Sequence, residues 1–317
     1  MRGVFLDRDS VDSGDLDLSV LEDALDNWQL YATTATPQVA ERIAGAEIVV
    51  SNKVPLTADT LAQASELRLI CVAATGTNNV DLAAATELGI AVCNVRGYAT
   101  PAVVQHVFAL ILALSTRLPQ YQRAVAEGRW QRSPFFCLLD YPIREIAGKH
   151  LGIVGFGELG RGVARVAEAF GMRVSVAARP GTVAAAGRVA LAELLRQVDI
   201  LSLHCPLTAQ TRGLIGAEAL ALMKPDALLI NTARGGIIDE SALAEALREG
   251  KLGGAGIDVV EREPPAAGDP LLAPDIPNLI LTPHIAWASR ESRQRLLNEV
   301  AENIRAYHLG QIRNQVA

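Results

Sequence analysis

The chain has 317 residues, of which 50% are hydrophobic and 20% are charged, and its formal net charge is −6 at pH 7. This length suits two domains, and the composition supplies enough apolar side chains for two buried cores, which argues against disorder. The net negative charge argues against a nucleic-acid-binding protein, because such proteins typically carry an excess of basic residues. The sequence has no apolar run of about 18 residues and no secretory signal, so we expect a cytoplasmic protein that does not span a membrane.

The first third of the chain alternates apolar segments with helical segments. This alternation predicts a parallel sheet that is covered by helices on both faces. The predicted strands comprise residues 3–7, 45–50, 67–73 and 90–93, and the predicted helices comprise residues 36–43, 57–63 and 81–88.

A long apolar helix is predicted over residues 101–117, with Pro101 at its start. It is too apolar for a surface helix, so we expect it to pack on another domain or another subunit. A loop that is rich in Trp, Phe, Tyr and Pro follows over residues 128–149.

A second series of strands and helices starts at Lys149. It predicts a second α/β domain with its own parallel sheet, followed by an amphipathic helix near the end of the chain. The predicted strands comprise residues 151–154, 173–177, 200–204, 227–231, 254–259 and 279–282, and the predicted helices comprise residues 158–170, 191–197, 217–222, 240–248 and 290–308.

The cysteines and histidines show no metal-ligand spacing. Cys71, Cys93, Cys137 and Cys205 form no CxxC pair, and the five histidines form neither HxxxH nor HExxH. We interpret the cysteines as small buried side chains in a reducing compartment, and we expect no metal site.

A glycine-rich segment in the second series predicts a dinucleotide site. The sequence LGIVGFGELGRG places Gly155, Gly157 and Gly160 between a predicted strand and a predicted helix, as the GxGxxG motif requires. Gly155 permits a tight turn, Gly157 lets the backbone approach a pyrophosphate, and Gly160 permits close packing of helix on strand. The N–H groups of the first helical turn, at Glu158 and Leu159, then face the phosphates. The alternative is a glycine-rich turn in a domain that binds no ligand.

The end of the next predicted strand indicates which dinucleotide binds. NAD sites usually carry a carboxylate there for the ribose 2′-OH, but this chain has Ala178 followed by Arg179. A guanidinium binds a 2′-phosphate through charge-assisted hydrogen bonds, so we favour NADP(H), with Arg188 as a second phosphate contact. The alternative is NAD(H), in which case Arg179 is a solvated loop residue.

Three segments at the carboxyl ends of predicted strands carry candidate catalytic residues, Arg234 in INTARGG, Glu263 in VVEREPP and His284 in LTPHIAW. Open parallel sheets hold their ligands at this end. Reduction of a 2-keto acid needs a cation for the carboxylate, an acid for the keto oxygen, and a carboxylate that orients the acid. Arg234, His284 and Glu263 fill these roles in turn. Taken singly, each has a structural alternative: a salt bridge, a structural histidine or a turn residue.

Together, these motifs resemble the D-isomer-specific 2-hydroxyacid dehydrogenase family over essentially the whole chain. The segments LGIVGFGELGRGVARVAEAFGMRV and LMKPDALLINTARGGIIDESALAEAL carry the resemblance, and the spacing of the Arg, Glu and His residues is that of the family. The resemblance implies two Rossmann-like or flavodoxin-like domains. A NAD(P)-binding domain of residues 100–285 is inserted into a substrate-binding domain of residues 1–99 and 286–317. It also implies a homodimer built on residues 100–148 and closure of the two domains over the substrate.

The resemblance assigns further contacts. Asp258 accepts a hydrogen bond from the nicotinamide carboxamide, and the N–H groups of Thr75 and Gly76 bind the substrate carboxylate. Most members carry Asp where this chain has Ala178, which bears on the choice of dinucleotide. The remaining implied cofactor contacts are Cys205, Pro206, Thr211, Thr232 and Ala233.

Within the family, the segments SNKVPLT, VAATGTNNVDL and TPHIAWASRE look most like glycerate dehydrogenases, also called hydroxypyruvate reductases. We therefore expect reduction of hydroxypyruvate or glyoxylate to D-glycerate or glycolate, and the reverse. Asn52 and Lys53 follow a predicted strand, where they either reach the substrate or belong to a capped loop. Trp287 either lines the substrate pocket or packs in the core.

Two alternatives stay open. The first is another D-2-hydroxyacid dehydrogenase, such as D-3-phosphoglycerate dehydrogenase, although we expect neither a C-terminal regulatory domain nor an extra basic cluster for a phosphate. The second is a dinucleotide-sensing corepressor scaffold, a role that one branch of the family has taken, which needs disordered flanks and a partner groove.

Overall fold

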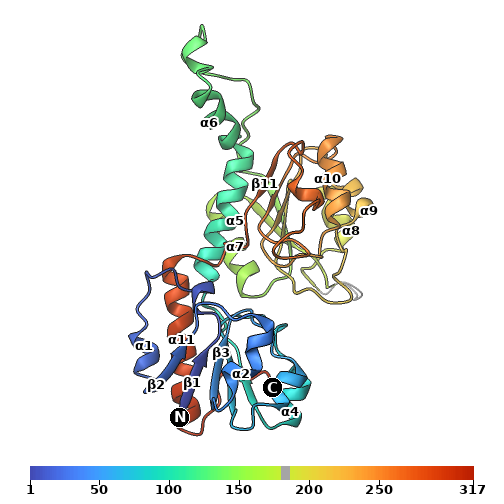
Figure 1. The fold of residues 1–317 in the computed structure, drawn as a ribbon. Helices are drawn as coiled ribbons and strands as arrows, with labels where there is room; N and C mark the ends of the chain where they lie inside the picture. The colour runs from blue at the N-terminus through green and yellow to red at the C-terminus, as the bar shows by residue number, and fades with distance from the viewer. Residues whose placement is uncertain (180–185) are drawn as a thin grey trace. The chain divides into compact units, whose positions relative to one another are not determined.

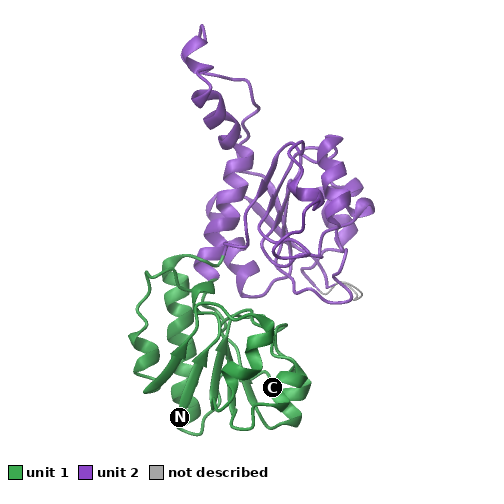
Figure 2. Ribbon diagram, in the orientation of Figure 1, with its two compact units in different colours: residues 1–99, 287–317 green, residues 100–286 purple. Residues whose placement is uncertain are grey.

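Figure 1 shows the computed structural model, in which residues 1–179 and 186–317 are described. The chain divides into two compact units. Unit 1 comprises Met1–Ala99 and Trp287–Ala317, and unit 2 comprises Thr100–Ala286, so unit 2 interrupts the sequence of unit 1 (Figure 2). Each unit contains one parallel sheet with helices on both faces. The predicted fold class, two parallel-sheet α/β domains of which one is inserted into the other, is confirmed.

The five strands of unit 1 pair in parallel in the order β2-β1-β3-β4-β5. Successive residues of a strand point to opposite faces, and both faces of the central strands are buried, which explains their uninterrupted apolar runs. In β3, Val49 packs in the core with α2, α3 and α4, whereas Ile48 and Val50 pack with α1 and α11. The elements are β1 (Arg2–Phe5), α1 (Ser19–Glu22), β2 (Asn27–Leu30), α2 (Val39–Ile43), β3 (Ile48–Ser51), α3 (Ala58–Ala62), β4 (Leu69–Val72), α4 (Leu82–Glu87), β5 (Ala91–Cys93) and α11 (Arg290–His308).

Strand β2 and helix α1 are not predicted from the sequence. β2 is an edge strand, and its four residues alternate between exposed and partly exposed, so it has no apolar run. The helix predicted over residues 36–43 differs in its first turn, which is a 3-10 turn over Thr36–Gln38 that precedes α2.

The six strands of unit 2 also pair in parallel, in the order β11-β10-β9-β8-β6-β7. After β7 the chain returns to the other side of β6 to form β8, so the direction of winding reverses between β6 and β8. Ligands of open α/β sheets bind at the carboxyl ends of the strands at such a point. The strands are β6 (His150–Val154), β7 (Arg173–Val176), β8 (Ile200–Leu203), β9 (Leu228–Asn231), β10 (Gly254–Ile257) and β11 (Leu279–Leu281).

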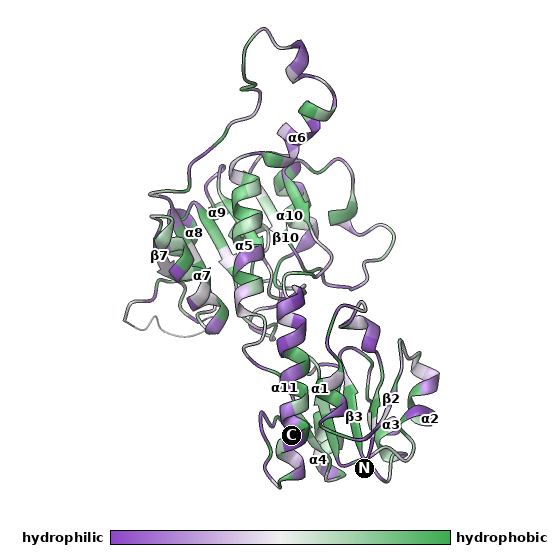
Figure 3. Cartoon of the chain, turned by 90° about the vertical axis from the view of Figure 1, so that its left-hand side faces the viewer, coloured by the Kyte–Doolittle hydropathy of each residue, from purple (hydrophilic) through white to green (hydrophobic). Residues whose placement is uncertain are grey.

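Helix α5 (Thr100–Ser115) packs against β9, β10 and α7 of its own unit, and hydrophobic residues gather along it (Figure 3). Glycines make this close packing possible. A Cβ at Gly256 of β10 would lie 2.9 Å from Leu110 Cβ, and a Cβ at Gly162 of α7 would lie 2.8 Å from Val104 Cγ2. The sheet of its own unit buries much of the apolar surface of this helix, which explains its apolar sequence, and the expected packing on another domain or subunit stays a prediction. The other helices are α6 (Leu118–Ala126), which is not predicted from the sequence, α7 (Glu158–Ala169), α8 (Leu191–Gln197), α9 (Ala217–Leu222) and α10 (Glu240–Arg248).

No single helix among residues 1–179 and 186–317 is long and apolar enough to cross a membrane. Helices α5 and α6 meet the length and composition limits only when they are joined, and they are bent by 61° relative to each other.

We predict that Gly162→Ala weakens unit 2 through a steric conflict with Val104. The new methyl group would lie 2.8 Å from Val104 Cγ2, so the free energy of unfolding should fall by about 1–2 kcal/mol. In a Val104→Ala background only the milder contact with Thr100 Cγ2 (3.3 Å) remains, and the better helix propensity of alanine should offset much of the loss. Urea unfolding of the four proteins in this double-mutant cycle measures the coupling. Equal losses in both backgrounds would contradict the steric explanation.

Candidate active site

The glycine-rich loop connects β6 to α7. Gly155 has φ +92°, and a Cβ there would lie 2.5 Å from the backbone N of Cys205 and the backbone C of His204, which follow β8. A Cβ at Gly160 would lie 2.2 Å from the carbonyl oxygen of Gly155. At Gly157, in contrast, a Cβ would meet no described atom within 4 Å. Packing therefore requires glycine at two of the three positions, and the third leaves open space where a ligand can approach.

The open space lies at the first turn of α7. The first N–H groups of a helix have no intrahelical partner, and the helix dipole makes this end positive. The N–H of Arg161 donates to the carbonyl oxygen of Gly157 (3.0 Å), which is the first intrahelical bond that involves the loop. Glu158, Leu159 and Gly160 precede Arg161 in the first turn. The Glu158 carboxylate accepts a hydrogen bond from Thr100 Oγ1 (2.5 Å), on α5. This turn is therefore suited to hold a pyrophosphate.

The segment after β8 faces the glycine loop. Cys205 is buried, and the Thr211 hydroxyl donates to the carbonyl oxygen of Pro206 (2.7 Å) and accepts from Thr208 N (2.7 Å). Thr211 is itself 5% exposed. It therefore shapes the turn that carries Cys205 and Pro206.

Two arginines lie near the end of β7. Arg179 follows the strand and is exposed, and the next residues that the structure describes begin at Ala186. Val189 forms an isolated parallel β-bridge with Ala177, and Ala178 N donates to Val189 O (2.7 Å). The Arg188 guanidinium carbon lies 4.9 Å from the centroid of the Phe156 ring in the glycine loop.

The three candidate catalytic residues follow β9, β10 and β11, which are neighbours in the sheet. His284 Nδ1 contacts Glu263 Oε2 at 2.6 Å, and Glu263 Oε1 accepts from Val260 N (3.1 Å). Arg234 is half-buried, and its Nη1 donates to the carbonyl oxygen of Ala233 (2.6 Å). The structure thus brings Glu263 and His284 into direct contact, with Arg234 on the neighbouring loop.

Close backbone contacts hold these loops together. A Cβ at Gly235 would lie 1.9 Å from the carbonyl oxygen of Val260, so the loop after β9 packs directly on the loop after β10. The side chain of Asn231, at the end of β9, accepts from Ala233 N (3.0 Å) and donates to Arg234 O (2.9 Å). Thr232 and Ala233 are both buried in this turn. Sequence reasoning missed Asn231, although a polar residue that ends an apolar strand is a signal that could have identified it.

Asp258 lies beneath the same edge. Its side chain is fully buried, and its carboxylate accepts from Thr282 Oγ1 (2.6 Å), Ile285 N (2.9 Å) and Ala286 N (2.9 Å). The assigned contact with a nicotinamide carboxamide stays a prediction. The observed hydrogen bonds tie the loop around His284 to β10.

Unit 1 presents its predicted residues after β3 and β4. Asn52 is buried, its N–H donates to Asp7 Oδ1 (2.9 Å), and its Nδ2 donates to Ser10 Oγ (3.0 Å). Lys53 N donates to Asp7 Oδ2 (2.7 Å). These bonds favour the capped-loop interpretation of Asn52, and they identify Asp7, which sequence reasoning missed, as the acceptor at the end of β1.

The loop after β4 is better suited to bind an anion than the loop after β3. No described residue accepts a hydrogen bond from the N–H of Thr75 or Gly76, and the Thr75 hydroxyl is held by the carbonyl oxygen of Val95 (2.8 Å). Trp287 is partly buried and meets Tyr98 edge to face, with ring centroids 6.3 Å apart.

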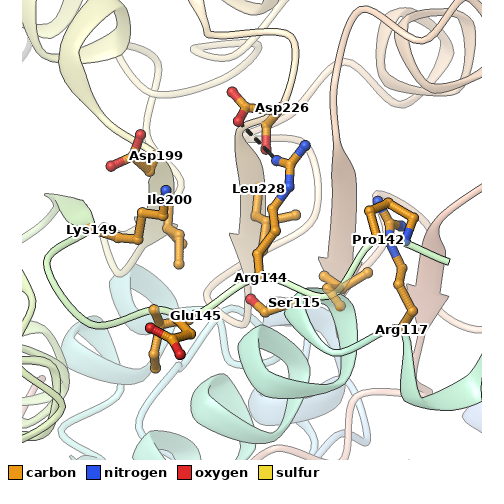
Figure 4. Close-up of a pocket in the computed structure, with 12 residues that line it drawn as sticks. Ser115, Arg117, Pro142, Arg144, Glu145, Lys149, Asp199, Ile200, Asp226 and Leu228 are labelled. Carbon is orange, nitrogen blue, oxygen red and sulfur yellow. Dashed lines mark hydrogen bonds and ion pairs between the residues drawn. The ribbon is translucent and has the colours of Figure 1, made fainter. Parts of the chain in front are cut away.

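The cavity in Figure 4 lies at the amino ends of strands in the unit 2 sheet, whereas the candidate active site lies at their carboxyl ends. It is open to solvent and borders Ile200 and Leu228, the first residues of β8 and β9. Arg144 in its wall donates to the Asp226 carboxylate (2.9 Å). Because ligands of open parallel sheets bind at the carboxyl ends of strands, this cavity is separate from the candidate active site.

Burial lowers the pKa of one histidine beside the glycine-rich loop, His204. His204 Nε2 bonds Ser202 Oγ (2.8 Å), and its Nδ1 is buried with no hydrogen-bond partner among residues 1–179 and 186–317. Loss of solvation lowers the pKa of His204 to about 4.

We therefore expect the free energy of unfolding to fall as the pH decreases from 6.5 to about 4. In this range the unfolded chain protonates the histidine and the folded chain does not, which costs up to about 1.4 kcal/mol per pH unit. The His204→Gln variant should show a shallower pH dependence in urea unfolding, whereas His308→Gln, at an exposed position of α11, should not. Parallel curves for the wild type and His204→Gln would refute this assignment.

Comparisons with known proteins bear on this arrangement. The family model described as "D-isomer specific 2-hydroxyacid dehydrogenase, NAD binding domain" matches residues 108–286. The chain is 47% identical over 314 residues to a glycerate dehydrogenase from Methylorubrum extorquens, with 99% of this chain and 98% of the relative covered. It is 38% identical over 317 residues to a hydroxypyruvate reductase from Blautia hydrogenotrophica, with 98% of both covered. A solved acyclic imino acid reductase in complex with NADPH and D-Arg superposes with a TM-score of 0.87 at 28% identity, and 100% of each chain is covered.

Proposed function

Because the chain belongs to the D-isomer-specific 2-hydroxyacid dehydrogenase family and is thus an oxidoreductase with a nicotinamide dinucleotide cofactor, we propose that it reduces hydroxypyruvate or glyoxylate with NADPH to D-glycerate or glycolate. It also catalyses the reverse reaction. The observation that carries this proposal is the 2.6 Å contact between His284 Nδ1 and Glu263, on the loops that follow adjacent strands. Two relatives that align over nearly their whole length carry the names glycerate dehydrogenase and hydroxypyruvate reductase, which supports the substrate class.

The chemistry follows from the residues at the carboxyl edge of unit 2. When bound, the reduced nicotinamide supplies the hydride for C2 of the keto acid. Glu263 accepts the hydrogen bond from Nδ1–H of His284 and so fixes the tautomer and ring orientation, which assigns proton transfer to Nε2. His284 protonates the keto oxygen during reduction and removes the proton during oxidation. Arg234 binds the substrate carboxylate through its forked guanidinium.

Residues of unit 1 are proposed to select the substrate. The N–H groups of Thr75 and Gly76 donate to the substrate carboxylate, and the absence of a described acceptor for either group supports this role. Trp287 provides an apolar wall. Asn52 acts by shaping the loop after β3, since its own polar atoms bond to Asp7 and Ser10.

Unit 2 is proposed as the dinucleotide-binding domain and unit 1 as the substrate-binding domain. The open space at Gly157 and the first turn of α7 hold the pyrophosphate, and the turn containing Cys205 and Pro206 borders the adenosine. Thr232 and Ala233 border the nicotinamide ribose. Arg179 binds the 2′-phosphate of NADP, and Arg188, which is stacked on Phe156, supplies a second cation.

We expect Arg179→Ala to raise the KM for NADPH at least ~10-fold and to leave the KM for NADH nearly unchanged. The guanidinium pairs with the 2′-phosphate, which NADPH carries and NADH lacks, and a charge-assisted pair contributes about 1.5–3 kcal/mol. Initial rates with hydroxypyruvate and each reduced cofactor measure the effect. Arg173→Ala, at the exposed amino end of β7, is the matched control. An equal effect on both cofactors would remove Arg179 from the 2′-phosphate site.

We expect Glu263→Gln to lower kcat for hydroxypyruvate by ~10²-fold or more, and His284→Ala by ~10²–10⁴-fold, because proton transfer depends on an oriented imidazole. Glu261→Gln is the control, since this neighbouring carboxylate is exposed and pairs with Arg212 at 2.7 Å instead. Turnover of 3-phosphohydroxypyruvate in preference to hydroxypyruvate would favour the phosphoglycerate alternative. Tight cofactor binding without turnover of any keto acid would favour the corepressor-like scaffold.

We further propose a homodimer built on residues 100–148. Beyond α5, this segment exposes large apolar side chains, and an apolar surface of this kind is typical of a subunit interface. The exposed side chains are Leu118, Val125, Trp130, Phe135, Phe136, Leu139 and Ile143.

Size-exclusion chromatography with light scattering tests the homodimer. The wild type should elute as a dimer, and the double variant Phe136→Ser, Leu139→Ser should be largely monomeric, because these two side chains are 91% and 83% exposed and cannot stabilise the monomer. A double change at exposed apolar positions elsewhere, Leu88→Ser with Leu309→Ser, should stay dimeric. A monomeric wild type would refute the proposal.

A further inference from the structure

We propose that His106, on helix α5, is a positioning residue that acts through Thr282 and Asp258 on the loop that carries His284. This inference rests on the proposed function, in which His284 transfers the proton. Nothing in the glycine-rich motif or in the Arg, Glu and His segments points to His106, which lies in the middle of an apolar helix.

The hydrogen-bond chain begins at the His106 ring. His106 Nε2 lies 3.0 Å from Thr282 Oγ1, and Thr282 Oγ1 lies 2.6 Å from Asp258 Oδ1. His106 Nε2 is also 3.5 Å from the same carboxylate oxygen. The three side chains come from α5, from the residue after β11 and from the residue after β10, and all three belong to unit 2.

The direction of each bond follows from donor counting. An ionised carboxylate only accepts, so the single hydroxyl hydrogen of Thr282 is donated to Asp258. Thr282 Oγ1 must then accept from His106, and His106 therefore carries its proton on Nε2. The histidine thus holds the Thr282 hydroxyl in the rotamer that points at Asp258.

The carboxylate of Asp258 passes this constraint to the loop. Its two oxygens accept from the N–H groups of Ile285 and Ala286, and its backbone carbonyl accepts from the N–H of His284 (2.8 Å). His284 itself has φ +55°, in the left-handed region that a residue with a side chain occupies only when its surroundings enforce it. Thr282 on one side of the turn and the N–H groups of Ile285 and Ala286 on the other donate to Asp258, and these bonds hold His284 in this conformation.

The hydrogen-bond chain begins on a rigid element, helix α5. Helix α5 is held against β10 at the glycines described above, and the His106 side chain is 19% exposed, so it has little freedom to move. If the Nε2–H donor is lost, the Thr282 hydroxyl can rotate and one oxygen of a fully buried carboxylate loses a donor. The His284 loop then loosens, and misplacement of a catalytic group by about 1 Å can cost on the order of 10²-fold in rate.

Two pairs of variants test the proposal. His106→Leu removes the donor, whereas His106→Gln can place an amide N–H near the Nε2 position. Thr282→Val removes the hydroxyl with little change of shape, whereas Thr282→Ser retains it. We expect His106→Leu and Thr282→Val to lower kcat for hydroxypyruvate by about 10-fold to 100-fold with less than about a 3-fold change in its KM, and the Gln and Ser variants to recover most of the activity. Gln105→Leu, at the exposed neighbouring position of α5, should behave as the wild type.

Amide hydrogen exchange at Ile285 and Ala286 gives a readout that does not require turnover. Exchange should accelerate in His106→Leu and Thr282→Val and return towards the wild-type rate in His106→Gln and Thr282→Ser. Wild-type kcat and exchange in both His106→Leu and Thr282→Val would overturn the proposal. Equal losses in the donor-retaining and donor-lacking variants, together with a lowered Tm, would show a packing role only and would also overturn it. Absence of turnover in the wild type would instead refute the proposed function, and the exchange data would still decide the role of His106.

Discussion

The buried carboxylate of Asp258 is the interaction on which the carboxyl edge of unit 2 depends. A charge without solvent contact must be surrounded by hydrogen-bond donors, and here the donors are the Thr282 hydroxyl and the N–H groups of Ile285 and Ala286. They belong to the chain that follows the neighbouring strand β11. Satisfying this one carboxylate therefore fixes where the His284 turn lies relative to β10. The contact between His284 and Glu263 follows, because Glu263 is anchored to the same loop through Val260 N.

Glycines provide the second constraint, because they let backbones meet where a side chain would collide. Gly155 contacts the segment after β8, Gly160 contacts Gly155, and Gly235 contacts Val260. The first two contacts shape the dinucleotide loop at the point where the winding of the sheet reverses, and the third joins the Arg234 loop to the Glu263 loop. Both parts of the candidate site are thus built at the same edge of one sheet. Polar side chains at the strand ends, such as Asn231, complete the turns.

Much of the candidate site can be predicted from the sequence because its motifs are local. A strand, a glycine-rich turn and a helix start are contiguous, so Gly155, Gly157 and Gly160 predict a phosphate-binding turn without any tertiary information. The order of Arg234, Glu263 and His284 after successive strands likewise indicates a shared edge. His106 and Asp7 could not be identified in this way, because their partners lie far away in the sequence and only folding brings them together.

The sequence by itself determined the two α/β units, nearly all of their strands and helices, and the chemical types at the carboxyl edge, because apolar periodicity and turn residues act over short distances. Tertiary structure alone decided the rest. It placed α5 on its own sheet, since the glycines that admit the helix lie on β10 and α7, and it recruited β2 as an edge strand, since pairing with β1 stabilises a segment that has no apolar run. It also buried Asn52 and Asp258 among specific donors and acceptors. Which polar group is satisfied by which partner depends on contacts between segments that are distant in the chain, and no local pattern encodes them.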